Sequence, residues 1–209
     1  YRRMPSGRNC RQYWCGSHLN FADDVVRRMN LPRKVEILDS TLRDGAQHFG
    51  IHLRGKDMIK IAHVLSDIGV HRIEVGKPHE HSREMKEIAS HGIDAITMGF
   101  CRLSRSDIDI CLKCDVDGVI LDFPASDIVI EGILKTKRER ILVKSIDLAS
   151  YAKKHGLYVT FFPYDTTRAD VGFVRQLLRA AVDDARVDSV CMVDTFGTAS
   201  PSAFAHLTR

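Results

Sequence analysis

A cation, a carboxylate and a flexible turn follow one short apolar run near the start of this chain. The run Val35–Leu38 is typical of a β-strand, and the segment Asp39–Gln47 that comes next contains Arg43, Asp44 and Gly45 in a row. Asp44 offers the oxygen ligands that a hard divalent metal prefers. Arg43 offers a planar cation that can stabilise an oxyanion formed beside that metal. The combination predicts chemistry on a carbonyl group.

Two further groups suited to chemistry lie at the ends of predicted strands. Glu74 belongs to the run Arg72–Val75, and Asp194 with Thr195 follows the run Ser189–Val193. Taken singly, an Arg-Asp pair is more often a surface ion pair, and a Thr after an Asp is more often a turn residue. The carboxyl ends of parallel strands share one edge of a sheet, where active sites are found. Their common position therefore favours a single site.

The elements that must position these groups alternate regularly along the chain. Apolar runs that predict strands are separated by stretches with helical spacing, and glycines end two of these stretches. Strands are predicted at 35–39, 72–75, 94–100, 118–123, 157–162 and 189–193, and helices at 54–68, 82–90, 104–113, 127–155 and 170–185. Another helix is predicted to begin at Ser200-Pro201. Repeated βα units of this kind indicate a parallel sheet with right-handed crossovers.

A parallel sheet of this kind is either doubly wound or closed into a (β/α)8 barrel. No GxGxxG motif follows the first strand, so dinucleotide binding has little support. A barrel needs eight units and typically ~250 residues. The sequence holds about six units in 209 residues. For a barrel, we therefore expect either a truncated chain or a partner that supplies the rest.

Four segments resemble the signature motifs of the DRE-TIM metallolyases, which include the isopropylmalate, homocitrate and citramalate synthases and the 3-hydroxy-3-methylglutaryl-CoA (HMG-CoA) lyases. Thr41–Gln47 resembles TLRDGEQ, Arg72–Pro78 resembles IEVGFP, Phe161–Arg168 resembles FSPEDATR and Asp194–Pro201 resembles DTVGxxxP. The resemblance covers roughly residues 35 to 201. It favours an α/β fold of the TIM (β/α)8 barrel type, truncated after about six βα units.

The resemblance also implies roles for individual residues. Arg43 and Glu74 would be catalytic, with Arg43 as the electrophilic group and Glu74 as the side chain that orients it. Arg43, Gln47 and Thr195 would bind substrate, with the Thr195 hydroxyl on the carboxylate of a 2-oxo acid. Acetyl-CoA would be the co-substrate.

In the same resemblance, Asp44 is a ligand of a divalent metal, which would be Mg, Mn or Zn. The other ligands, a His-x-His pair, are expected beyond Arg209. The His-x-His of this chain, His79–His81, follows the second strand, and we interpret it as a loop although imidazoles at this spacing can share a metal. The CxxC at Cys111–Cys114 lacks a second pair, which predicts buried structural thiols.

The implied activity is a Claisen-type condensation of acetyl-CoA with a 2-oxo acid by a metal-dependent acyltransferase. An alternative within the family is a carbon-carbon lyase or aldolase, of the HMG-CoA lyase or 4-hydroxy-2-oxovalerate aldolase type. Tyr164 replaces the Glu of FSPEDATR and weakens the prediction of synthase specificity. An alternative of another class is a non-catalytic barrel fragment that acts as a binding or scaffold subunit.

Composition and charge set the remaining expectations. The hydrophobic content of 44% and the charged content of 28% are those of an ordinary globular protein, and no apolar run is long enough to span a membrane. The six cysteines are scattered, which is typical of reduced thiols in a cytoplasmic protein. We expect a cytoplasmic homodimer that binds neither membrane nor nucleic acid.

Charge separates the two ends of the sequence. Residues 1–34 carry eight basic and two acidic side chains, so the net charge of +4 divides into +6 there and −2 in residues 35–209. We predict a basic N-terminal arm at 1–34, solvated or packed on a subunit, and a catalytic domain at 35–209. An Arg-rich, acid-poor start is also typical of organellar transit peptides, which is the weaker interpretation.

Overall fold

The structure, a computed structural model, describes residues 17–28, 32 and 34–208. The chain divides into two compact units, Tyr1–Val35 and Glu36–Arg209. In the first unit, a 3-10 helix, η2 (His18–Phe21), is followed by α1 (Asp23–Val26). Residues 1–16, 29–31 and 33 of the predicted basic arm lie outside the described residues. The arm as a separate domain therefore stays a prediction.

Six parallel strands form a single sheet in the second unit. They are β1 (Leu38–Asp39), β2 (Arg72–Gly76), β3 (Ile96–Arg102), β4 (Gly118–Pro124), β5 (Tyr158–Tyr164) and β6 (Ser189–Val190). Their order in the sheet is their order in the chain, and every neighbouring pair is parallel. A doubly wound sheet reverses its strand order at a switch point. This sheet does not, and it has the strand order of a (β/α)8 barrel.

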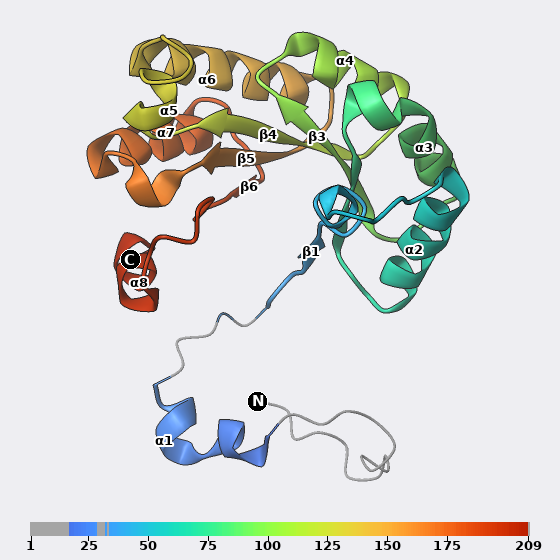
Figure 1. Cartoon of the computed structure of the whole chain (residues 1–209), viewed down its shortest axis with the longest axis horizontal. Coiled ribbons are helices and arrows are strands. Elements are labelled where there is room, and N and C mark those ends of the chain that lie inside the picture. The colour runs from blue at the N-terminus through green and yellow to red at the C-terminus, as the bar shows by residue number, and fades with distance from the viewer. Residues whose placement is uncertain (1–16, 29–31, 33, 209) are drawn as a thin grey trace. The chain divides into compact units, whose positions relative to one another are not determined.

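Helices cover the convex face of the curved sheet (Figure 1). They are α2 (Gly55–Asp67), α3 (Pro78–Ser90), α4 (Arg105–Lys113), α5 (Asp127–Ile130), α6 (Arg138–Lys154) and α7 (Val171–Asp183), and α8 (Pro201–Leu207) follows β6. Two short 3-10 helices, η3 (Gly45–Gln47) and η4 (Thr166–Arg168), follow β1 and β5. None of the helices in the described part of the chain is long and apolar enough to cross a bilayer.

The two faces of the sheet have different environments because successive side chains of a strand point to opposite sides. In β4, Val119, Leu121 and Phe123 are buried in the hydrophobic core that the sheet shares with the helices. Ile120 and Asp122 alternate with them and therefore face the concave side. The hydrophobic core thus lies on the convex face of the sheet, and the concave face is available for a functional site.

The predicted helix at 127–155 is in fact two helices. α5 ends at Ile130, and Lys135 has a φ of 51°, a left-handed conformation that an α-helix cannot continue through. The chain restarts at Arg138, whose Nε donates to Asp127 Oδ1 at 2.6 Å. The prediction of one long helix was wrong because helical spacing persisted across a turn that is held by an ion pair.

Three other boundaries differ from the predictions. α3 begins at Pro78, a favoured first residue of a helix, so His79–His81 belongs to a helix and not to a loop. The outer strands are shorter than predicted, with two residues each in β1 and β6. Each of them pairs with one neighbour only, and residues such as Val35 and Ile37 are exposed.

Candidate active site

The turn after β1 presents Arg43 and Asp44 to the concave side. Asp39, the last residue of β1, caps this turn, because its carboxylate accepts from the Thr41 N–H at 2.9 Å and from the Thr41 hydroxyl at 3.1 Å. Leu42 is fully buried in the core. The cap and the buried leucine hold the backbone, so the two charged side chains that follow have a fixed origin.

Arg43 is held in place by two residues from the longer strands. Its Nε donates to Glu74 Oε2 of β2 at 2.5 Å, and its guanidinium lies over the Phe100 ring of β3, 4.0 Å from the centroid. Glu74 is 2% exposed, and this burial raises its pKa above the ordinary value although Arg43 acts to lower it. A guanidinium fixed in this way is a preorganised donor, as the stabilisation of an oxyanion requires.

Asp44 is the most open member of this cluster. Arg43 Nη1 donates to Asp44 Oδ1 at 2.9 Å, and the side chain of Asp44 is 64% exposed. Its second oxygen accepts no hydrogen bond from the described residues. The structure therefore brings Arg43, Asp44 and Glu74 together, with one carboxylate oxygen left for a cation.

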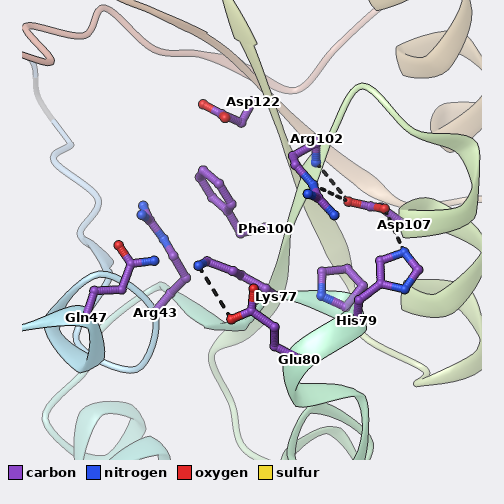
Figure 2. Close-up of a pocket in the computed structure, with 10 residues that line it drawn as sticks. Arg43, Gln47, Lys77, His79, Glu80, Phe100, Arg102, Asp107 and Asp122 are labelled. Atoms are coloured by element: carbon purple, nitrogen blue, oxygen red, sulfur yellow. Dashed lines mark hydrogen bonds and ion pairs between the residues drawn. The ribbon is translucent and has the colours of Figure 1, made fainter. Parts of the chain in front are cut away.

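Arg43 lines two cavities on the concave side of the sheet. The first, of about 300 Å³, includes Gln47, Lys77, Arg102 and Asp122 in its lining (Figure 2). Other charged side chains of this cavity form ion pairs. Lys77 Nζ lies 3.6 Å from Glu80 Oε2, and Arg102 Nε lies 3.5 Å from Asp107 Oδ2. The predicted substrate residue Gln47 thus lies in this cavity, on an exposed turn.

The second cavity, of about 390 Å³, brings Asp44 and Thr195 together from opposite ends of the sheet. It shares Arg43, Phe100 and Asp122 with the first cavity. Of the predicted site residues, Arg43, Asp44 and Thr195 therefore line one cavity, and Gln47 lines its neighbour.

The loop after β6 is ordered by Asp194 and leaves Thr195 available. The Asp194 carboxylate accepts from the Thr167 hydroxyl at 2.7 Å and from the N–H groups of Thr198 and Ala199. These bonds, that of Thr167 foremost, lower the pKa of Asp194. Thr195 Oγ1 accepts from the Asp165 N–H at 2.8 Å, which leaves the hydroxyl proton for a ligand.

Comparison with known proteins places the chain in a family. The model of the HMGL-like family matches residues 34–209. This chain is a member of the HMGL-like family. It is 38% identical over 184 residues to homocitrate synthase AksA of Methanothermobacter thermautotrophicus, an alignment that covers 87% of this chain and 47% of that protein. It is 35% identical over 186 residues to 2-isopropylmalate synthase of Methanocaldococcus jannaschii, with coverage of 88% and 36%.

This HMGL-like chain therefore spans less than half the length of these two relatives. Among solved structures, HMG-CoA lyase of Bacillus subtilis has a TM-score of 0.73 at 17% identity, with 86% of this chain and 64% of that chain covered. The likeness shows the fold alone. The predicted membership of the DRE-TIM metallolyases and the predicted barrel architecture are both confirmed.

Sequence reasoning missed Asp122 in this HMGL-like site. Asp122 lines both cavities, and no described residue forms a hydrogen bond or ion pair with its carboxylate (Figure 2). Burial raises its pKa to about 7, with Arg43 lowering it and Glu74 raising it further. The available signal was a single charged residue within the apolar run Gly118–Pro124.

The two histidines of the HMGL-like chain's His-x-His segment have different partners. His79 Nε2 lies 3.0 Å from Asp107 Oδ1, and His81 Nδ1 accepts from the Lys77 N–H at 3.2 Å. Among the described residues, no group of three or more His, Cys, Asp or Glu side chains is placed to hold a metal. The two cysteines of the CxxC segment, Cys111 and Cys114, are buried in the core.

Proposed function

We propose that this chain carries part of the active site of an acyltransferase that condenses acetyl-CoA with a 2-oxo acid, in the manner of isopropylmalate, homocitrate and citramalate synthases. The observation that carries the proposal is the fixed guanidinium of Arg43, which faces one cavity together with Asp44 and Thr195. The printed names of the two relatives are those of synthases, which supports the same class of reaction.

The side chains divide the work of this reaction among them. The Thr195 hydroxyl donates to the carboxylate of the 2-oxo acid, which points the keto oxygen toward Arg43. When the enolate carbon of the thioester attacks the keto carbon, negative charge builds on that oxygen, and the Arg43 N–H groups stabilise it. Glu74 keeps Arg43 from turning away, and Gln47 contacts the substrate from the adjoining cavity.

A divalent metal, when bound, would polarise the keto group as a Lewis acid. Asp44 is the residue that we propose as its ligand, because one of its oxygens is free beside the cavity. The described residues supply no complete ligand set, so the other ligands would come from elsewhere in the protein.

The metal assignment is tested by Asp44→Ala in the full-length protein. Titration calorimetry with Mn²⁺ should show affinity reduced by at least the roughly 10–100-fold that loss of an outer-shell partner causes. The fold should be retained, because the Asp44 side chain is 64% exposed. Unchanged metal affinity would remove Asp44 from the ligand set.

The condensation leaves CoA joined to the product as a thioester, and hydrolysis of that thioester by water gives a carboxylate and free CoA thiol. Release of the thiol therefore tests the reaction. The full-length protein and its metal are supplied with 2-oxo acids whose distal group is short, branched or a second carboxylate. We expect thiol release that depends on both the metal and one class of 2-oxo acid. Absence of release with every acid tested would refute the condensation.

A lyase or aldolase reaction is the second candidate, and Tyr164 is the observation that favours it. Tyr164 lines the second cavity, and burial raises its pKa above 10. At neutral pH its phenol is therefore a proton donor, where a carboxylate would be a base. The test supplies a 3-hydroxyacyl thioester or a 4-hydroxy-2-oxo acid. Cleavage of either compound, without condensation in the thiol assay, would assign the chain to this class.

A further inference from the structure

Asp122 is the carboxylate of the concave face that has no partner. It lies on β4 opposite Phe162 of β5 and beside Arg102 of β3 in the strand register. It belongs to the wall that the two cavities share, and in the part of the chain that the structure describes no hydrogen bond or ion pair holds it. Figure 2 shows it above Phe100 with no dashed line to any residue drawn.

The other acidic groups on this wall are already engaged. Glu74 is bound by Arg43, and Asp44 shares the same guanidinium. In the first cavity, Glu80 pairs with Lys77. Asp107 is 2% exposed and contacts His79 and Arg102. Among the described carboxylates of the two cavities, Asp122 is the one that no described side chain binds, which leaves it to exchange a proton with a ligand.

The charges around Asp122 favour such an exchange. Arg43 stabilises the carboxylate, whereas burial and Glu74 stabilise the acid, and the balance places the pKa of Asp122 at about 7. Arg102 adds a cation from the neighbouring strand, but it is turned to Asp107. Tyr164 stays protonated at this pH, because the ordinary pKa of a tyrosine is well above 7 and burial raises it further. A group that changes charge near the working pH is well suited to proton transfer.

We propose that Asp122 is the catalytic base that takes a proton from the methyl carbon of the acyl thioester. The inference rests on the proposed condensation and adds to it a named proton acceptor. If the chain works in the cleavage direction, the same group returns a proton to the same carbon.

The step balances without any further reactant. The methyl C–H bond breaks, its proton passes to Asp122, and its electron pair becomes the enolate. The enolate carbon forms the new bond to the keto carbon, and the carbonyl π pair moves to the keto oxygen, which faces Arg43. The alkoxide takes up one proton from solvent, and Asp122 releases one to solvent, so the net proton count is unchanged.

The test measures exchange of the acetyl-CoA methyl hydrogens with D₂O by the full-length, metal-loaded protein, together with the pH dependence of kcat/KM. Asp122→Asn keeps the shape of the side chain and removes its titration. We expect exchange and kcat to fall about 10²–10⁴-fold, with KM for the 2-oxo acid within about twofold. The loss of activity on the acid side of pH 7, present in the wild type, should disappear.

Glu80→Gln is the matched control, because it removes a carboxylate from the same cavity and should keep the wild-type rate and pH profile. If the Asn variant does not fold, Asp122→Glu and carbon NMR of the Asp122 carboxyl in the wild type decide instead. Asp122→Glu should keep the acid-side loss of activity at a shifted pH, and the NMR midpoint should match the kinetic one.

Three results would overturn the assignment. They are wild-type exchange by Asp122→Asn, an unchanged pH profile in that variant, or an NMR midpoint far from the kinetic one. In each of these cases the condensation would stand if the wild type still released CoA. A wild type that turns over no thioester would remove the condensation first, and the base with it.

Discussion

The inner and outer strands of the sheet differ in how they are held. β3, β4 and β5 have seven residues each and contact strands on both sides, whereas β1 and β6 have two residues each and pair on one side only. Val119 in β4 is fully buried, and Val190 in β6 is 43% exposed. Burial of apolar side chains holds the inner strands in place, whereas the outer strands bury little apolar area.

The proposed site draws on both regions. Arg43, Asp44 and Thr195 follow the short outer strands, whereas Glu74 and Asp122 lie within the longer inner ones. The difference shows how Arg43 is positioned, because a capped turn holds its backbone and contacts with Glu74 and Phe100 of the inner strands hold its guanidinium. The predictions below test that dependence.

The largest effect should come from removing the inner partner of the outer guanidinium. Glu74→Ala leaves the part-buried Arg43 without its main counter-charge, and loss of one member of a buried pair typically costs ~3–5 kcal/mol. Urea unfolding measures it. Glu80→Ala, which removes the more exposed partner of Lys77, should cost at most about 1 kcal/mol. Equal losses of unfolding free energy in the two variants would contradict the dependence of Arg43 on its inner-strand partner.

Arg43→Lys should affect turnover more than stability. A lysine keeps the charge but not the planar fork that Glu74 and Phe100 orient. We expect kcat to fall about 10²–10³-fold, which corresponds to ~2.7–4 kcal/mol. KM for the 2-oxo acid should change less, and steady-state kinetics of the full-length protein measure both. A lysine variant with near wild-type turnover would leave Arg43 as a structural partner of Glu74 only.

A pair of matched valines compares the two regions directly. Val119→Ala should lower the free energy of unfolding by ~1.5–3 kcal/mol, because that side chain is fully buried. Val190→Ala should change it by no more than about 0.5 kcal/mol. Thermal and urea unfolding of both variants decide the matter. A large effect at Val190 would show that the outer strand is packed more tightly than its exposure indicates.

The effect that is smallest per measured step is the pH slope that Asp122 gives to stability. Its folded pKa of about 7 lies above the ~3.9 of an unfolded Asp, so the native state binds this proton more tightly. The contribution is complete below about pH 4 and is lost as pH rises to about 7, by at most ~1.4 kcal/mol per unit. Urea midpoints over this range should therefore show a shallower decline, or none, in Asp122→Asn. Parallel curves for the two proteins would contradict the raised pKa.

The inner βα units could be predicted from the sequence because local patterns determine them. The runs Arg72–Val75 and Gly118–Phe123 contain the apolar residues that predict strands, and they became β2 and β4 within one residue. The motif residues Arg43, Asp44 and Glu74 were found because they adjoin such runs. Their roles in binding and catalysis stay predictions that the experiments above address.

Other features depend on contacts between distant segments, and no local pattern contains them. The lengths of β1 and β6 depend on how many strands lie beside them. The break between α5 and α6 depends on the left-handed turn at Lys135 and on the Arg138 ion pair. Asp122 lay inside the predicted strand at 118–123, and its place beside Arg43 required knowledge of which strand faces adjoin.

The sequential strand order also bears on how the chain acquires its structure. Paired residues of neighbouring strands are between 20 positions apart, as for Met98 and Gly118, and 40 positions apart, as for Gly118 and Tyr158. Each strand can therefore dock on the one that precedes it without waiting for distant sequence, and short loops close at a lower entropic cost than long ones. During synthesis from the N-terminus the sheet can grow one unit at a time. The guanidinium of Arg43 then gains its partner Glu74 as soon as the second strand has emerged.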